Sequence, residues 1–207
     1  MKQTYYKIPG WFNYAESYDV IVDNVADDGI IVEIGSFLGR STHYLATSLF
    51  NADKLNVKVY YIDTFKNYSE HSSLNLPDDF YPMYRENLKF FIGREMVIPI
   101  QGRSDDPAIL ARFKDESIDY MMVDGAHEYE PVLSDIQKWW PKMKQDGVML
   151  GNYFTLESVK KDIKKSLPVV KAPSYGVNQS MEQTWYASKS GNHTHFEKQV
   201  PGTNCLT

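Results

Sequence analysis

A carboxylate and an imidazole stand three residues apart in this chain, at Asp124 and His127. They follow a nearly continuous apolar run, residues 118–123, of the kind that forms a buried parallel strand. Two such groups at the end of one strand can converge on a shared pocket, and a histidine with an ordinary pKa of ~6.5 suits the removal of a proton from a nucleophile. The pair is therefore a candidate for general-base chemistry. The alternative is that His127 begins a helix and forms only local hydrogen bonds.

A second candidate is the segment Glu33–Gly39, which follows the β-branched run 29–34 and precedes an expected helix. Gly35 permits a sharp turn, and Gly39 permits close backbone approach. The segment lacks the Gly-x-Gly-x-x-Gly dinucleotide fingerprint, and no Gly-Lys-Ser or Gly-Lys-Thr follows it, which excludes a P-loop. Two interpretations stay open: the loop binds a ligand whose contact with it need not be a phosphate, or it is a tight strand-to-helix turn that binds no ligand.

Asp63 ends the second apolar run, thirty residues after Glu33. A carboxylate at this place can accept hydrogen bonds from a ribose diol in nucleotide-binding folds. The alternative is an aspartate that caps a helix or closes a turn. Because each of the two motifs lies where the other predicts it, together they favour a nucleoside ligand.

These segments resemble a known superfamily. Val32–Thr42 is similar to the loop that binds S-adenosylmethionine (SAM) in class I SAM-dependent methyltransferases, and Met122–Glu130 resembles the Val-Asp-Gly-x-His-x-Tyr segment of one group within it. That group includes macrolide-sugar O-methyltransferases and cephalosporin hydroxylase-like proteins. Further matches run from about Pro9 to about Lys189, at Ser134–Trp140, Gln145–Tyr153 and Thr184–Tyr186.

The resemblance implies a SAM-dependent O-methyltransferase that acts on a small hydroxylated acceptor such as a sugar or glycoside. It implies that three loops contact SAM: Glu33, Gly35, Ser36 and Gly39 at its amino-acid part, Asp63 at the ribose with Thr64 and Phe65 beside the adenine, and Gly102, Ser104 and Asp105 along the border of the base. Many relatives carry an acidic residue where this chain has Arg103. The contact to the adenine amino group would therefore fall to Ser104 or Asp105.

The same resemblance places Asp124 and His127 between the methyl donor and the acceptor, with Asp124 also contacting SAM. Sugar O-methyltransferases of this group often bind magnesium through the corresponding aspartate and acidic residues after the fifth strand. Here the second position is Asn152. Magnesium prefers hard, usually charged oxygen ligands. A metal held by Asp124 and Asn152 is therefore doubtful, and activity is expected to depend little on added magnesium.

The elements that must position these residues alternate between short apolar runs and amphipathic stretches. The runs predict strands at 29–34, 57–62, 95–100, 118–123, 147–150 and 184–187, and the stretches predict helices at 14–27, 41–50, 107–113, 129–143 and 156–167. Such alternation is typical of an α/β fold. With the resemblance, it predicts a Rossmann-like, doubly wound and mostly parallel seven-stranded sheet with helices on both faces. We expect one domain over 1–207, with an N-terminal helical segment (1–28), a lid-like insertion (66–92) and a C-terminal tail (190–207).

Composition narrows the classes of partner. The net charge of -5 argues against a broad nucleic-acid surface, and the absence of a long apolar run argues against a membrane span. The single cysteine, Cys205, favours a cytoplasmic protein. The expected partner is a small-molecule acceptor. Aromatic residues near the N-terminus could cover the pocket or form a contact in a homo-oligomer: Tyr5, Tyr6, Trp11 and Phe12.

Two other functional classes stay open at this stage. A nicotinamide-dependent oxidoreductase could use a similar sheet, although the dinucleotide fingerprint is missing. A SAM-fold protein without transferase activity would tolerate the departures from the family pattern at Arg103 and Asn152. Binding of SAM and of NAD would separate these classes.

Overall fold

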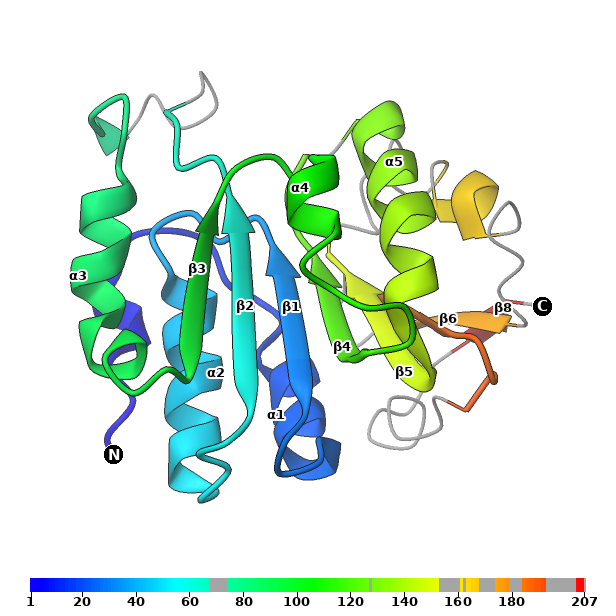
Figure 1. Cartoon of the computed structure of the whole chain (residues 1–207), viewed down its shortest axis with the longest axis horizontal. Coiled ribbons are helices and arrows are strands. Elements are labelled where there is room, and N and C mark those ends of the chain that lie inside the picture. Colours follow the sequence, from blue (N-terminus) through cyan, green and yellow to red (C-terminus); the bar gives the residue numbers. More distant parts are fainter. Residues whose placement is uncertain are drawn as a thin grey trace.

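The computed structural model describes residues 1–67, 74–126, 128–152, 161, 163–167, 174–178, 184–192 and 204–206. Within them a single sheet of eight strands runs in the order β3-β2-β1-β4-β5-β7-β6-β8 (Figure 1). The strands are β1 (Ile30–Ile34), β2 (Lys58–Asp63), β3 (Val97–Gln101), β4 (Ile118–Val123), β5 (Met143–Gly151), β6 (Ser174–Asn178), β7 (Thr184–Ser188) and β8 (Asn204–Leu206).

Strands β1 to β5 are parallel, and β7, β6 and β8 add to the β5 edge with antiparallel pairing. The predicted fold class is confirmed, but the predicted count of seven strands is wrong. All six runs expected from the sequence are strands, and β6 and β8 are additional. β8 lies in the segment expected to be a tail.

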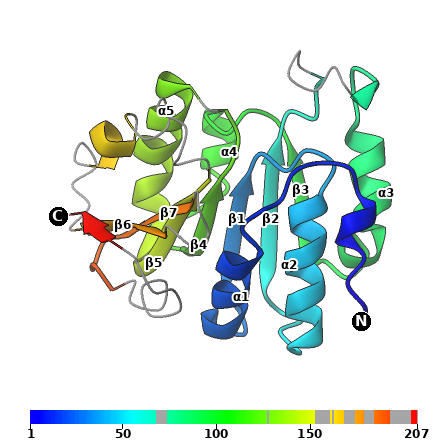
Figure 2. The ribbon, with the colours of Figure 1, turned by 180° about the vertical axis from the view of Figure 1, so that it is seen from behind.

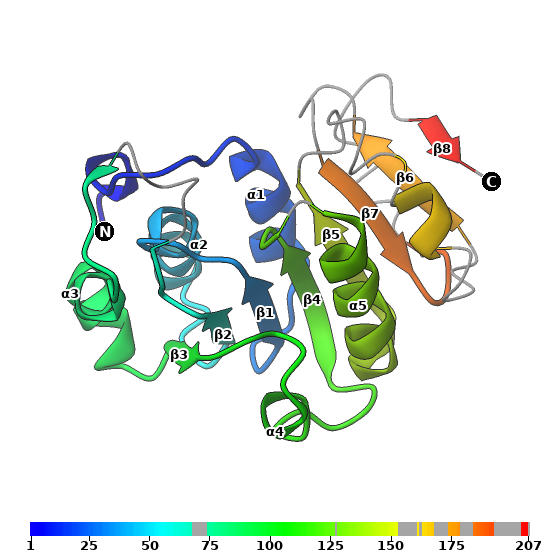
Figure 3. The same ribbon diagram turned by 90° about the horizontal axis from the view of Figure 1, so that it is seen from above.

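Helices cover both faces of the sheet, as Figure 3 shows from above. One face carries α1 (Ala15–Asn24), α2 (Arg40–Asn51) and α3 (Tyr81–Ile92), and the other carries α4 (Pro107–Leu110) and α5 (Tyr129–Trp139). Short 3-10 turns stand at Tyr5–Lys7 (η1) and Trp140–Lys142 (η3). Because both faces are covered, strand β4 is buried at nearly every position.

The core forms two clusters, one on each side of the sheet. The periodic face predicted for the helix after β4 is confirmed, since Val132, Ile136 and Trp139 of α5 are buried in the second cluster. The predicted start of α4 is also confirmed: Asp106 caps it by accepting a hydrogen bond from the Ala108 amide at 2.8 Å.

Two segments differ from expectation. The insertion at 66–92 contains α3, a helix that the sequence reading did not expect, and its residues Tyr84, Leu88 and Phe91 are buried in the core; a role of the insertion as a lid stays a prediction. The N-terminal segment is helical only in η1 and α1. Residues 8–14, here called the strap, have no helical structure and run from η1 over the top of α2 to α1 (Figure 2).

The predicted helix at 156–167 and the expected absence of a membrane span can each be compared with the described residues. The helix predicted at 156–167 is described in part: 163–167 is helical with Ile163 and Leu167 buried, while 153–160 lies outside the described residues. In the part of the chain that the structure describes, every helix is too short or too polar to span a bilayer.

Candidate functional site

The predicted site loops meet at the carboxyl edge of the parallel strands. Backbone hydrogen bonds continue the sheet one residue past the strand ends: Gly35 donates to the Ile62 carbonyl at 3.0 Å, and Asp124 donates to the Ile34 carbonyl at 2.9 Å. In the same way the Gly102 amide donates to the Asp63 carbonyl at 2.8 Å. The loops after β1, β2, β3 and β4 are thus tied to one another, at the edge where α/β sheets bind ligands.

Gly35 allows the loop after β1 to touch the loop after β4. Its φ is +82°, a left-handed conformation, and a Cβ here would lie 2.6 Å from both the Asp124 carbonyl carbon and the Gly125 Cα. Gly39, with φ +86°, is the N-cap of α2 and faces α3, where a Cβ would lie 2.8 Å from Leu88 Cδ1. Both glycines thus allow a turn and a close approach, as the sequence indicated. The groups that they approach are protein groups and not a ligand.

Asp63 holds the glycine loop by its backbone. One carboxylate oxygen accepts from the amides of Ser36 and Phe37, each at 2.9 Å, and the other accepts from the Phe65 amide at 2.7 Å. The carboxylate therefore fixes the loop that the resemblance assigns to SAM. A carboxylate can accept about four hydrogen bonds, and the three amides leave one position for a ribose hydroxyl. That contact stays a prediction.

Asp63→Ala is expected to lower the free energy of unfolding by about 2–3 kcal/mol and to weaken SAM binding, because three amide groups lose a charged acceptor. Chemical denaturation and calorimetry with SAM measure the two effects. The matched control is Asp27→Ala at an exposed aspartate, expected to stay within about 0.5 kcal/mol of wild type. Equal stability and affinity in both variants would show that Asp63 does not order the loop.

Glu33 lies in a cage of hydroxyl groups. The Tyr18 hydroxyl donates to Oε2 at 2.5 Å, and the Ser41 hydroxyl donates to Oε1 at 2.7 Å. Tyr61 also donates to Oε2, and the Tyr14 hydroxyl lies 3.4 Å from Oε1. Burial raises the pKa of Glu33 to about 7, against the effect of these hydrogen bonds. Since protein donors surround both oxygens of this fully buried carboxylate, the geometry does not favour the predicted direct contact with SAM.

Asp124 has one occupied oxygen and one free one. Tyr14 donates to Oδ2 at 2.8 Å, whereas Oδ1 is buried and has no hydrogen-bond partner. Burial raises the pKa of Asp124 to about 8; the Tyr14 hydrogen bond and the neighbouring Asn152 side chain lower it, and the nearby charge of Glu33 raises it. Asn152 lies beside this carboxylate, donates to Asn13 of the strap at 3.3 Å, and also has a buried Oδ1 without a partner.

The other two predictions at this place are not settled. His127 lies outside the described residues, so its role as a base stays a prediction. For a metal, Asp124 and Asn152 each offer one oxygen atom without a hydrogen-bond partner, and at most one of the two side chains is charged. The described residues contain no group of three His, Cys, Asp or Glu side chains that could hold an ion. This donor set does not fit a tight magnesium centre.

The loop after β3 is held by α5. The Ser104 hydroxyl donates to Asp135 at 2.6 Å, and the Trp139 indole donates to the Ser104 carbonyl at 3.1 Å. Asp105 forms a bidentate ion pair with Arg103, and that guanidinium lowers its pKa. The predicted adenine contacts of Ser104 and Asp105 therefore compete with contacts inside the protein.

Phe65 points into the core. Its ring is fully buried and lies 4.7 Å from the Tyr81 ring and 4.8 Å from the Tyr84 ring. Thr64 next to it is partly exposed. An adenine contact from Thr64 stays a prediction, and the burial of Phe65 does not favour one from that ring.

Sequence reasoning missed three residues of this region. Tyr14 and Tyr18 come from the N-terminal segment, and their four-residue spacing was the one available sign of a shared face. Asp135 is buried on α5 between Val132 and Trp139, and burial raises its pKa to about 6, against the Ser104 hydrogen bond. A charged residue within the apolar stripe of a helix was the signal that could have identified it.

The strap closes over the glycine loop. Arg40 at the start of α2 donates to the Gly10 carbonyl at 2.6 Å, and the Trp11 ring lies 6.0 Å from the Phe37 ring. Trp11 is nevertheless 61% exposed. The strap therefore brings a large exposed aromatic surface to the loop assigned to SAM.

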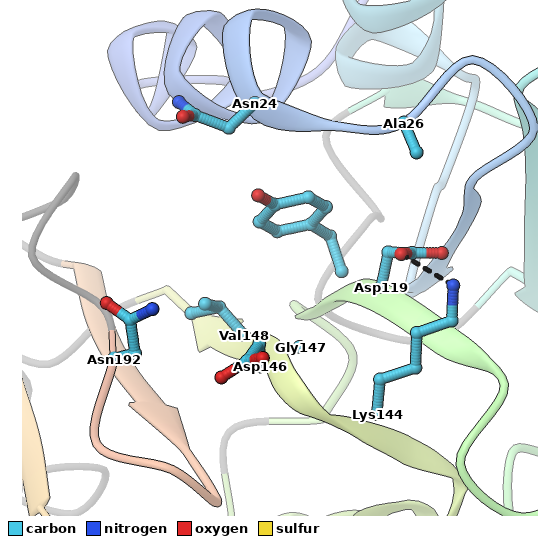
Figure 4. A pocket seen from close by; sticks show the side chains of 9 residues that line it. Asn24, Ala26, Asp119, Lys144, Asp146, Gly147, Val148 and Asn192 are labelled. Carbon is cyan, nitrogen blue, oxygen red and sulfur yellow. Dashed lines mark hydrogen bonds and ion pairs between the residues drawn. The ribbon is translucent and has the colours of Figure 1, made fainter.

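A cavity of about 320 Å³ lies elsewhere, near the amino ends of the parallel strands (Figure 4). Asp119 crosses it to form an ion pair with Lys144 at 2.8 Å, and its other oxygen accepts from the Ile30 amide at 2.9 Å. Asp119 thus fastens the start of β1 to β4 and β5. These contacts of Asp119 hold the sheet together, whereas Gly35, Asp63 and Asp124 all lie at the opposite, carboxyl end of the strands.

Comparison with known proteins agrees with this geometry. Residues 32–152, from β1 to the residue after β5, match a family model described as a methyltransferase domain. Among solved structures, the calicheamicin methyltransferase CalS11 is 16% identical with a TM-score of 0.64, over 84% of this chain and 77% of that one. The O-methyltransferase NovP is 16% identical with a TM-score of 0.61, over 86% and 80%.

A SAM-dependent O-methyltransferase from Thermotoga maritima is also 16% identical, with a TM-score of 0.57 over 87% of this chain and 67% of that one. Identities this low show a shared fold. A search of curated protein sequences returns no match. The family model, in contrast, spans more than half of the chain and includes the glycine loop, Asp63 and Asp124. The chain belongs to the methyltransferase domain family.

Proposed function

We propose that the chain is a SAM-dependent O-methyltransferase that acts on a small hydroxylated acceptor such as a sugar or glycoside. The observation that carries the proposal is the meeting of the Gly35 loop with Asp124 at the carboxyl edge of a methyltransferase-family sheet, where Asp124 keeps one oxygen without a partner. An unpaired buried acceptor costs free energy unless a ligand donor satisfies it.

The residues present fit SAM. The glycine loop is ordered by Asp63, and Glu33 and Asp124 form ion pairs with none of the described lysine and arginine side chains. A cationic ligand would therefore complement this end of the sheet. When bound, SAM supplies an activated methyl group. The chain's own residues would align the acceptor and accept its proton.

The preference for oxygen acceptors and sugars rests on similarity. The solved structure of NovP is described as an O-methyltransferase, and a structure of CalS11 is described as a TDP-rhamnose 3'-O-methyltransferase. The exposed ring of Trp11 beside Phe37 supports the same class of acceptor, because a sugar ring can pack its apolar face on an aromatic side chain.

Transfer of a radioactive methyl group from SAM to panels of free sugars, nucleotide sugars, glycosides, phenols and amines tests this proposal. We expect label in at least one hydroxylated class and none in the amines. Label that appears in amines alone would overturn the O-methyltransferase assignment while leaving the family intact.

His127→Ala is expected to lower the rate of methyl transfer by about 10²–10⁴-fold with SAM affinity nearly unchanged, since loss of a general base affects the chemical step. Single-turnover kinetics with the acceptor found above measures the rate. The pH–rate profile should lose the limb that reflects histidine. A variant with the full rate would make His127 structural and leave Asp124, or a water that it holds, as the base.

A further inference from the structure

The Tyr14 hydroxyl lies between two buried carboxylates that come from different loops. It is 2.8 Å from Asp124 Oδ2 and 3.4 Å from Glu33 Oε1. A hydroxyl group has one proton to donate. The shorter distance assigns that proton to Asp124, so Tyr14 is a donor to the site residue that follows β4.

Packing fixes where this hydroxyl stands. The Tyr14 ring is 1% exposed and meets the Phe12 ring edge-on at 4.9 Å and the Tyr18 ring edge-on at 5.2 Å. Tyr14 is also the residue at which the strap ends and α1 begins. The donor is therefore held from the strap and α1, outside the loops that carry the other site residues.

Tyr14 determines how the Asp124 carboxylate is turned. Because Oδ2 accepts from Tyr14, Oδ1 is the oxygen left buried without a partner. The Asp124 backbone touches Gly35 so closely that a Cβ on Gly35 would lie 2.6 Å from its carbonyl carbon. Oδ1 therefore belongs to a residue in direct contact with the first glycine of the loop assigned to SAM.

The two carboxyl groups near this oxygen favour a cationic donor, because a positive charge stabilises their ionised forms against the effect of burial. Glu33 and Asp124 are both buried carboxyl groups within reach of one tyrosine. Across the described residues, no lysine or arginine forms an ion pair with either of them. An ammonium group brings both the positive charge and the N–H donors that are missing.

We propose that Tyr14 is a positioning residue that turns the Asp124 carboxylate so that Oδ1 accepts a hydrogen bond from the ammonium group of SAM. The inference rests on the proposed function, since it needs SAM at the Gly35 loop. It makes the strap and α1 part of the cofactor site, although Tyr14 itself would not touch the cofactor.

The chain offers a matched pair of variants for the test. Tyr14→Phe and Tyr18→Phe each remove a buried tyrosine hydroxyl beside Glu33, but only the Tyr14 hydroxyl donates to Asp124. Calorimetry compares two ligands: S-adenosylhomocysteine, which has the ammonium group, and 5′-methylthioadenosine, which lacks the whole amino-acid part. We expect Tyr14→Phe to bind S-adenosylhomocysteine about tenfold more weakly than Tyr18→Phe does, with equal affinities for methylthioadenosine.

A double-mutant cycle assigns the effect to Asp124. In an Asp124→Asn background the difference between the two tyrosine variants should disappear, because the oriented carboxylate is already gone. Should Tyr14→Phe not fold, Asp124→Glu keeps the charge and moves its oxygens away from Tyr14. That variant is expected to show the same selective loss of S-adenosylhomocysteine.

Several results would overturn the inference. The first two are equal affinities of the two tyrosine variants for S-adenosylhomocysteine, and a loss of affinity in Tyr14→Phe that is as large for methylthioadenosine as for S-adenosylhomocysteine. The others are a difference between the tyrosine variants that persists in the Asp124→Asn background, and an affinity of Asp124→Glu for S-adenosylhomocysteine that equals that of wild type. Failure of the proposed function has another signature, because the wild-type protein would then bind neither ligand.

Discussion

Gly35→Ala is expected to lower the free energy of unfolding by about 3–5 kcal/mol and to eliminate SAM binding. A methyl group would lie 2.6 Å from the Asp124 carbonyl carbon and the Gly125 Cα, and closer still to the Asp124 carbonyl oxygen, so two backbones must separate. The φ of +82° adds the cost of a left-handed conformation for a residue with a Cβ. Denaturant unfolding and calorimetry with SAM measure both effects.

Gly93→Ala is the matched control. Gly93, just after α3, has no left-handed φ, and a Cβ there would meet its nearest neighbour, the Lys89 carbonyl, at 3.2 Å. We expect this variant to stay within about 1 kcal/mol of wild type. If Gly35→Ala were as stable as the control and bound SAM normally, the close contact between the two loops would have no part in the site.

Glu33→Leu is expected to destabilise the protein by about 4 kcal/mol or more. The change leaves the hydroxyl groups of Tyr18, Ser41 and Tyr61 without their shared acceptor, and a stranded buried donor costs about 1–3 kcal/mol. Glu86→Leu on the exposed surface of α3 is the control, expected to change stability by less than about 1 kcal/mol. Similar losses in both variants would show that the cage does not stabilise the fold.

The same residue predicts a dependence of stability on pH. Burial raises the folded-state pKa of Glu33 from 4.5 to about 7. A raised pKa means that the stabilisation from protonated Glu33 is complete below about pH 4.5 and is lost as the pH rises toward about 7. Between these values the stability of wild type should therefore fall relative to Glu33→Gln. Parallel pH curves for the two proteins would show that the pKa of Glu33 is not raised.

Local signals in the sequence predicted much of the fold. The β-branched runs, the capping Asp106 and the periodic face of α5 are properties of neighbouring residues, and the structure confirms each of them. Helix α3 was missed although Tyr84, Leu88 and Phe91 carry its spacing, because the polar stretch before it favoured a loop. Strand β6 has the sequence Ser-Tyr-Gly-Val-Asn, which lacks the long apolar run of a central strand.

The site was less readable because its contacts are long-range. The sequence indicated that Gly35, Asp63 and Asp124 share one edge, since the ends of parallel strands coincide there. It could not indicate that Asp63 binds backbone amides, or that Glu33 is enclosed by hydroxyl groups. The first depends on how the loops after β1 and β2 meet, and the second depends on the path of the strap and on how α1 packs, which no local pattern records.

Calorimetric titration of the wild-type protein with S-adenosylhomocysteine, and with NAD as a control, tests the central claim most directly. We expect one molecule of S-adenosylhomocysteine to bind per chain and to raise the free energy of unfolding by ~2.7 kcal/mol at ~100 times its dissociation constant. NAD should neither bind nor stabilise, because the chain lacks the dinucleotide fingerprint. Binding of NAD without binding of S-adenosylhomocysteine would contradict the account.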